Sequence, residues 1–392
     1  MLIQLIDIFY PNVFKRYSSK YNIYRELYEN DLTGMEIRAI TPKLAGRIKK
    51  IILNNKEICY ISPNQPGGTQ DILVLGTYGI FKEIAKEIIA TGNEEIGFKI
   101  THVIKNISEY DKLCLNIDDK VFPMDKAYVM GILNVTPDSF SDGGKFLNKE
   151  AAVEHSIRML DEGASFIDIG GESTRPGANP VSNDEELDRV IPIIESIIKL
   201  KPEAIISIDT TKSTVAEEAL KKGAKVVNDI SSFSDPNLLE TVKRFNASLI
   251  LMHMKGSPKT MQISPAYDDV VSEIYDYLID KCEIAKKAGI KNIIIDPGIG
   301  FGKRIFDNYE LIKRLSEFKG IGHPILIGVS RKTFIGGPLK LGIEDREEAT
   351  LAAETTAIKN GARIIRTHTV KKTILASRIN YFIENPESLN NV

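Results

Sequence analysis

The chain has 392 residues, which allows one large domain or two domains of ordinary size. Its 51 basic and 53 acidic residues nearly balance, which argues against non-specific nucleic-acid binding and against a polybasic membrane arm, so a small-molecule partner is expected. The three cysteines show no Cys-x-x-Cys spacing, and the sequence shows neither a signal peptide nor a long apolar span. We therefore expect a cytoplasmic protein with reduced thiols.

Residues 1–122 are predicted to form a small α/β unit. Helices are expected at 41–55 and 78–92, and short strands at 57–61 and 71–75, from the apolar periodicity and the residues at the helix ends. The function of this unit is not readable from its residues. An oligomerisation role and a role in bracing the rest of the chain are both open.

Residues 123–392 are predicted to form a barrel. Short β-rich runs alternate there with amphipathic helices, the pattern of repeated βα units and a parallel sheet. The eight predicted strands are 128–135, 165–170, 204–209, 225–229, 248–253, 292–296, 324–330 and 363–368. Eight such units over about 265 residues predict a (β/α)8 TIM barrel. A doubly wound sheet would more often show five or six strands and a Gly-x-Gly-x-x-Gly turn after the first strand, which the sequence lacks.

Polar side chains stand at the C-terminal end of every predicted strand, where a TIM barrel carries its chemistry. In chain order they are Asn134, the run 170–177, Asp209, Asn228 with Asp229, His253, Asp296, the run 330–332, and Arg366 with His368. Any one of them could instead cap a helix or bond a loop amide. Carboxylates such as Asp209 and Asp296 need a cationic or hydrogen-bond-donating partner at a buried strand end. Four basic side chains stand on the same face and imply an anion: Arg175, Lys332, Arg366 and His368. The ligand is therefore expected to carry both hydrogen-bond donors or positive charge and an anionic group.

The stretch "MGILNVTPDSFSDGG", residues 130–144, resembles the first signature of the dihydropteroate synthases. Seven further stretches resemble the remaining motifs of that family in the same order: "IDIGGESTRPGA", "SIDT", "VNDIS", "LMHMKGSPKTMQ", "DPGIGFGK", "GVSRKTFIG" and "RTH". The resemblance covers about residues 128–384. It implies a transferase of folate synthesis that condenses 4-aminobenzoate with 6-hydroxymethyl-7,8-dihydropterin diphosphate, so that dihydropteroate and diphosphate are formed.

The resemblance also implies which residues hold the pterin ring. Carboxylates and an amide suit the ring donors, and an ammonium suits the ring acceptors; these residues are Asp209, Asn228, Asp296 and Lys332. Arg366 matches the arginine that lies against the pterin face, where a planar guanidinium can stack. Met252 and Phe301 match apolar wall residues, and ordinary packing would explain both as well.

The diphosphate is implied to lie beside the pterin with Mg²⁺. Asn134 would supply an oxygen ligand to the ion, and the alternative is an asparagine in a tight turn before "TPDS". Residues 137–144 would then form a mobile loop rather than the start of a helix. The residues implied around the leaving group are Thr174, Arg175, Arg366 and His368.

The second substrate is implied to bind over the first. Phe140 and Pro176 would wall the aminobenzoate ring, and its carboxylate would meet the hydroxyl and backbone amides near Thr333. Loss of diphosphate leaves a delocalised cation on the pterin, so an SN1-like substitution stabilised by electrostatics is expected. The catalytic set is then Asp209, Asp296, Lys332, Arg175 and His368.

One position departs from the family pattern. Thr369 stands where an aspartate is usual, which weakens a carboxylate role beside His368. Two other functions stay open: a pterin-binding methyltransferase that passes a methyl group from a folate to a corrinoid, and a pterin-binding module without turnover. The motifs "GESTRPG" and "GVSRKTFIG" favour the synthase, because methyl transfer has no diphosphate and no aminobenzoate carboxylate to hold. A homodimer is expected.

Overall fold

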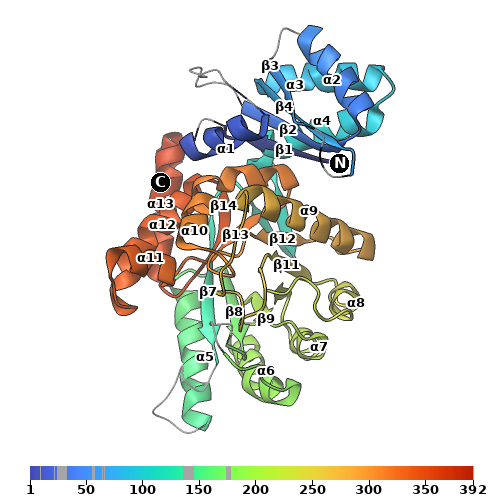
Figure 1. The fold of residues 1–392 in the computed structure, drawn as a ribbon. Coiled ribbons are helices and arrows are strands. Elements are labelled where there is room, and N and C mark those ends of the chain that lie inside the picture. Colours follow the sequence, from blue (N-terminus) through green and yellow to red (C-terminus); the bar gives the residue numbers. More distant parts are fainter. Residues whose placement is uncertain are drawn as a thin grey trace. The chain divides into compact units, whose positions relative to one another are not determined.

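The structure, a computed structural model, describes residues 1–8, 10–21, 23, 33–54, 58–63, 65, 67–135, 145–173 and 178–391. The chain forms two compact units (Figure 1): Met1–Tyr110 with Glu317–Gly322, and Asp111–Ser316 with His323–Val392. In the part of the chain that the structure describes, no helix is long and apolar enough to cross a membrane.

The first unit is built on a four-stranded antiparallel sheet with the strand order β1-β2-β4-β3. The strands are β1 (Leu2–Ile6), β2 (Thr33–Ile40), β3 (Ile58–Ile61) and β4 (Gln70–Gly76), and the helices are α1 (Pro11–Tyr21), α2 (Pro42–Asn54), α3 (Tyr78–Ala90) and α4 (Glu94–Ser108). Successive side chains of a strand point to opposite faces. Ile72 and Val74 therefore pack in one core with α2, α3 and α4, whereas Leu73 and Leu75 pack in another with α1. The predicted small α/β unit is confirmed, with β1, α1, β2 and α4 as additional elements.

The second unit contains a closed barrel of eight parallel strands in chain order, so the predicted TIM barrel is confirmed. The strands are β7 (Tyr128–Asn134), β8 (Phe166–Gly170), β9 (Ile206–Asp209), β10 (Val226–Asp229), β11 (Ser248–Met252), β12 (Ile293–Asp296), β13 (Ile325–Ile327) and β14 (Ala362–Thr367). The α-helices are α5 (Lys145–Asp161), α6 (Asn183–Leu200), α7 (Ser213–Lys221), α8 (Leu238–Arg244), α9 (Val270–Ala288), α10 (Ile305–Lys313), α11 (Thr333–Leu339), α12 (Glu347–Lys359) and α13 (Val370–Glu384). Short 3-10 helices complete the chain: η1 (Tyr110–Lys112), η3 (Leu315–Ile321), η4 (Glu344–Arg346) and η5 (Pro386–Asn391).

The strand register brings the C-terminal ends of the strands to one level. Asn134 of β7 lies beside Gly170 of β8, and Gly170 lies beside Asp209 of β9, which in turn lies beside Asn228 of β10. On the next strands Met252 lies beside Asp296. Polar residues that are distant in the sequence therefore meet at one end of the barrel, as expected for this fold.

Four barrel strands, β7, β11, β13 and β14, end earlier in the structure than in the sequence prediction. β13 ends at Ile327, so 330–332 follow the strand instead of ending it, and His253 and His368 come directly after β11 and β14. The chain leaves the extended conformation after β13, and Arg331 has a positive φ of 58°. These residues still stand at the C-terminal end of the barrel, but on the loops above it.

A β-hairpin, β5 (Cys114–Ile117) and β6 (Lys120–Pro123), belongs to the barrel unit. Its side chains Leu115, Ile117 and Phe122 share one buried core with Met130 of β7 and with residues of the other barrel strands. The sequence analysis placed most of this hairpin in the segment 1–122. The division of the chain into functional domains at 122/123 stays a prediction.

Candidate active site

Arg366 lies between two buried aspartates at the C-terminal end of the barrel. Its Nε donates to Asp168 Oδ2 at 2.6 Å, and its terminal nitrogen donates to Asp209 Oδ2 at 2.8 Å. Asn228 Nδ2 also donates to Asp168 Oδ2, at 3.0 Å, so the oxygen of that amide faces away from Asp168. Four side chains from β8, β9, β10 and β14 thus form one hydrogen-bonded network, which we call the arginine network: Asp168, Asp209, Asn228 and Arg366.

Burial governs the charge of this network. It raises the pKa of Asp209 to about 7, because removal from water disfavours the carboxylate; the charge of Arg366 opposes this shift, and the nearby Asp168 adds to it. Burial also acts to lower the pKa of Arg366, but its two aspartates outweigh burial and raise that pKa. The guanidinium is therefore charged, and Asp209 is poised between its two protonation states near neutral pH.

A second group of side chains surrounds Asp296 at the end of β12. Asp296 Oδ1 accepts a hydrogen bond from Gly298 N at 2.7 Å. Gly298 has a φ of 70°, and a Cβ there would stand 2.0 Å from the carbonyl oxygen of His253, so only glycine fits this turn. Burial raises the pKa of Asp296, and the charge of Lys332 opposes that shift.

Lys332 acts on Asp296 through its charge and contacts an aromatic side chain. Its ammonium donates to the carbonyl of Ile299 and lies 4.5 Å from the ring centroid of Phe301, within the range of a cation–π interaction. Burial lowers the pKa of Lys332 to about 8, while Asp296 raises it. The charges of Arg366 and Asp209 also act on Lys332, so the two groups share one electrostatic environment.

Lys303 contacts the backbone of the loop that carries Phe301. The buried Nζ of Lys303, whose pKa burial lowers well below its usual value, contacts the carbonyl oxygens of Phe301 at 3.0 Å and His253 at 3.3 Å, and it lies 3.0 Å from His253 Nδ1. Burial lowers the pKa of His253 to about 2, so the neutral ring can accept a hydrogen bond from the lysine. His253 thus bonds within the protein. The same holds for Asp229, whose carboxylate accepts hydrogen bonds from Ser231 and from the backbone N–H of Phe233.

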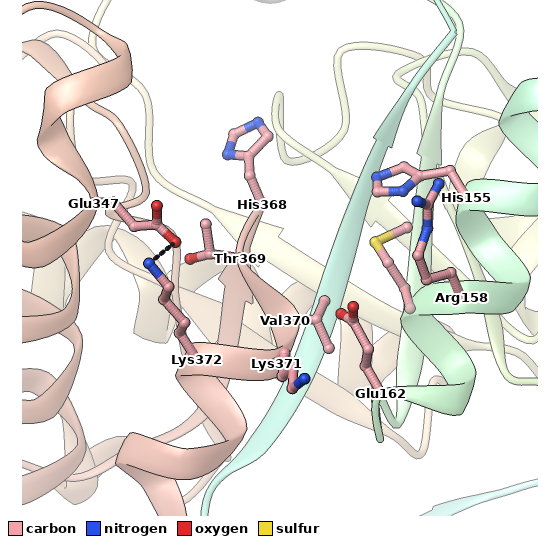
Figure 2. A pocket seen from close by; sticks show the side chains of 10 residues that line it. His155, Arg158, Glu162, Glu347, His368, Thr369, Val370, Lys371 and Lys372 are labelled. Carbon is pink, nitrogen blue, oxygen red and sulfur yellow. Dashed lines mark ion pairs between the residues drawn. The ribbon is translucent and has the colours of Figure 1, made fainter.

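His368 follows β14 and borders a pocket of about 410 Å³ (Figure 2). The ring nitrogen Nδ1 of His368 lies 3.0 Å from Ser330 Oγ. The hydroxyl of Thr369 lies 3.3 Å from that of Thr367, so the residue that replaces the usual aspartate bonds within the protein. The pocket is lined by α5 on one side and by the start of α12 and α13 on the other: His155, Arg158, Glu162, Glu347, Val370, Lys371 and Lys372.

The other expected site residues have these places. Asn134 is half-buried at the end of β7, Met252 is buried at the end of β11, and Thr333 is the exposed first residue of α11. Four expected residues lie outside the described residues: Phe140, Thr174, Arg175 and Pro176. Among the residues described, no group of three or more His, Cys, Asp and Glu side chains is arranged to hold a metal ion.

Sequence reasoning missed Asp168 and Lys303. Asp168 sits inside the apolar run "FIDIG" and is fully buried, so a charged residue within a predicted core strand was the available signal. Lys303 carries no comparable signal, because a lysine after a glycine-containing loop is normally exposed. Together the described residues offer carboxylate and amide acceptors beside an ammonium and a guanidinium, a set suited to a flat heterocycle with both donors and acceptors.

The family model that describes pterin binding enzymes matches residues 130–368. The chain is 48% identical over 254 residues to the dihydropteroate synthase of Escherichia coli K12, and the aligned part covers 64% of this chain and 90% of that protein. It is 46% identical over 251 residues to the dihydropteroate synthase of Bacillus subtilis, over 63% of this chain and 85% of that protein.

Solved structures agree with these relatives. A Yersinia pestis dihydropteroate synthase in a sulfonamide complex has a TM-score of 0.66 and 42% identity, covering 69% of this chain and 99% of that one. A Xanthomonas albilineans dihydropteroate synthase with 4-aminobenzoic acid has a TM-score of 0.65 and 40% identity, covering 69% of this chain and 98% of that one. The chain therefore belongs to the pterin-binding enzyme family, as a member of its dihydropteroate synthases.

Proposed function

We propose that the protein joins 4-aminobenzoate to 6-hydroxymethyl-7,8-dihydropterin diphosphate, which yields 7,8-dihydropteroate and diphosphate in folate biosynthesis. As a dihydropteroate synthase the chain is a transferase. The observation that carries the proposal is the arginine network together with Asp296 and Lys332 at the C-terminal end of the barrel. The relatives reported above are dihydropteroate synthases, which favours this reaction over methyl transfer and over binding without turnover.

The pterin ring would lie among the acceptors of these two groups. Asp209 and Asp296 accept the ring donors, and the oxygen of Asn228, which faces away from Asp168, accepts another. The ammonium of Lys332 donates to a ring acceptor, and the guanidinium of Arg366 lies against the ring face. Phe301, beside Lys332, and Met252, at the end of β11, supply apolar contacts.

The diphosphate would lie toward His368 and Asn134. Arg366 supplies positive charge and His368 a ring nitrogen from the end of β14, and Thr174 and Arg175 add donors from the segment after β8. The side-chain oxygen of Asn134, at the end of β7, would hold Mg²⁺ there, because an amide oxygen is a hard ligand that suits this ion. When bound, the ion would neutralise charge on the leaving diphosphate.

The reaction would begin when the bond between the pterin methylene carbon and the diphosphate oxygen breaks. The carboxylates of Asp209 and Asp296 stabilise the positive charge that develops on the pterin, and Arg175, Lys332 and His368 complete the charged environment. The amine of 4-aminobenzoate then attacks the methylene carbon and loses a proton. Phe140 and Pro176 would wall its ring, and the hydroxyl of Thr333 would meet its carboxylate.

The proposed partner is a second copy of this chain. Helix α13 exposes three apolar side chains four residues apart, which lie on one face: Leu375 (56% exposed), Ile379 (59%) and Ile383 (69%). Covering this stripe with the same stripe of another copy would remove it from water. A cytoplasmic location stays a prediction, in keeping with the three free cysteines Cys59, Cys114 and Cys282.

The first prediction tests the function and its carboxylates together. The purified protein is expected to form dihydropteroate from the two substrates and Mg²⁺, and Asp209→Asn and Asp296→Asn are each expected to lower kcat by on the order of a hundredfold, because each removes a preorganised charge from a developing cation. Asp280→Asn, at an exposed position of α9, is the control and is expected to match the wild type. Near-wild-type turnover in both site variants would refute the electrostatic role, and absence of product with the wild type would refute the function.

The second prediction concerns Mg²⁺. Asn134→Ala, or omission of Mg²⁺, is expected to weaken binding of the pterin diphosphate by about tenfold or more and to leave binding of a pterin without diphosphate nearly unchanged, because the proposed ion would act on the charge of the diphosphate. Isothermal titration calorimetry with both ligands measures the difference. Equal losses for the two ligands would mean that Asn134 serves the pterin pocket or the fold instead.

The third prediction concerns the oligomer. Ile379→Lys is expected to convert a dimer to a monomer, because a charge would enter the apolar stripe of α13. Ile284→Lys, at an exposed isoleucine of α9, should leave the mass unchanged. Light scattering after size-exclusion chromatography reads both variants, and a wild-type protein that elutes as a monomer would contradict the dimer.

A further inference from the structure

Lys212 makes three hydrogen bonds just above the strand that carries Asp209. It lies between β9 and α7, three residues after Asp209 in the sequence. Its ammonium donates to Glu172 Oε2 at 2.5 Å, to Glu186 Oε2 at 2.6 Å and to the carbonyl oxygen of Val181 at 2.9 Å. An ammonium has three N–H donors, so these acceptors use its full capacity.

Two of the three acceptors lie at the two ends of one segment. Glu172 precedes residues 173–180 and Val181 follows them, so a single ammonium holds both ends of that segment together. Arg189 of α6 adds a further bond before the segment, from Nη1 to the carbonyl of Gly171 at 2.6 Å. Lys212 thereby links the ends of the segment after β8 to the end of β9.

The third acceptor, Glu186, ties Lys212 to helix α6. The side chain of Glu186 on α6 is only 1% exposed, and its Oε1 has no hydrogen-bond partner among the described residues. A buried carboxylate depends strongly on the cation that pairs with it, and among the described residues this cation is Lys212. Without Lys212, the carboxylates of Glu186 and Glu172 would lose the shared cation that the structure describes between them, and their repulsion would push Glu172 away from α6.

We propose that Lys212 is a positioning residue that fastens both ends of residues 173–180 to the strand end holding Asp209. The inference rests on the proposed function, in which Thr174, Arg175 and Pro176 of this segment serve the diphosphate and the aminobenzoate. Misplacing such groups by about 1 Å can cost a hundredfold in rate. Lys212 would thus set the distance between the residues for the leaving group and the carboxylate for the pterin, without touching either ligand itself.

A purely structural link between α6 and α7 is the competing explanation, and the chain contains a matched control for it. Lys222, at the other end of α7, pairs with Glu195 of α6 at 2.6 Å. This pair joins the same two helices, but it lies away from residues 173–180 in the sequence and is more exposed, with side chains 40% and 49% accessible. Lys222→Met therefore removes a link between these helices without releasing the segment.

The test compares Lys212→Met, Glu172→Gln and Lys222→Met with the wild type. For Lys212→Met we expect kcat/KM to fall by at least about tenfold and affinity for the pterin diphosphate to weaken by a similar factor, with affinity for a pterin without diphosphate within about twofold of the wild type. Glu172→Gln, which keeps Lys212 and Glu186, should show the same pattern to a smaller extent. Lys222→Met should match the wild type in all three measurements.

Hydrogen exchange of the amides in 171–182 supplies a readout that does not depend on turnover. Exchange should be faster in Lys212→Met and Glu172→Gln and unchanged in Lys222→Met. Equal loss of affinity for both pterin ligands, or unchanged exchange in this segment, would overturn the inference. If Lys212→Met does not fold, the result for Glu172→Gln decides between the two explanations. Glu172 is partly exposed, with a side chain 26% accessible, so this variant is expected to fold. An inactive wild type with the expected exchange pattern would instead refute the proposed function alone.

Discussion

The site depends on the need to pair charges that are buried at the ends of the barrel strands. A carboxylate out of water is costly unless a cation or several donors face it. Arg366 meets this need for Asp168 and Asp209 at once, and Lys332 offsets Asp296. Because the pairing exists in the protein itself, the acceptors for a ligand are held in place before any ligand arrives. Such preorganisation is what electrostatic catalysis requires.

The barrel supplies the geometry for this pairing. Parallel strands in register bring Asn134, Gly170, Asp209 and Asn228 into one row. The other groups are brought in by the loops above the strands, where Gly298 forms a turn that no other residue fits. The carboxylates of the site thus lie on barrel strands, and its cations lie on the loops above the strands and on β14.

Sequence patterns predicted the barrel because each of its strands is a short apolar run with a polar end. The elements β1, α1, β2 and α4 were not predicted; α4 contains Gly97 and several β-branched residues, which weaken a helix signal. Gly97 stands there because a Cβ would lie 2.7 Å from the carbonyl oxygen of Ala85 in α3, a reason visible only in three dimensions. Asp168, Lys212 and Lys303 escaped prediction likewise, since their partners are distant in the sequence.

The proposed function requires that Asp209, held beside Arg366, be an anion to accept the donors of the pterin. Because burial raises the pKa of Asp209 to about 7, the carboxyl is protonated in acid and cannot accept in the same way. The most direct measurement is the affinity for a pterin without diphosphate from pH 5.5 to 8.0 by calorimetry, for the wild type and Asp209→Asn. We expect wild-type affinity to rise with pH and to level off above about pH 7, whereas the variant should bind more weakly and with little pH dependence. A wild-type affinity that is constant over this range, or a variant with the same pH dependence as the wild type, would contradict this requirement.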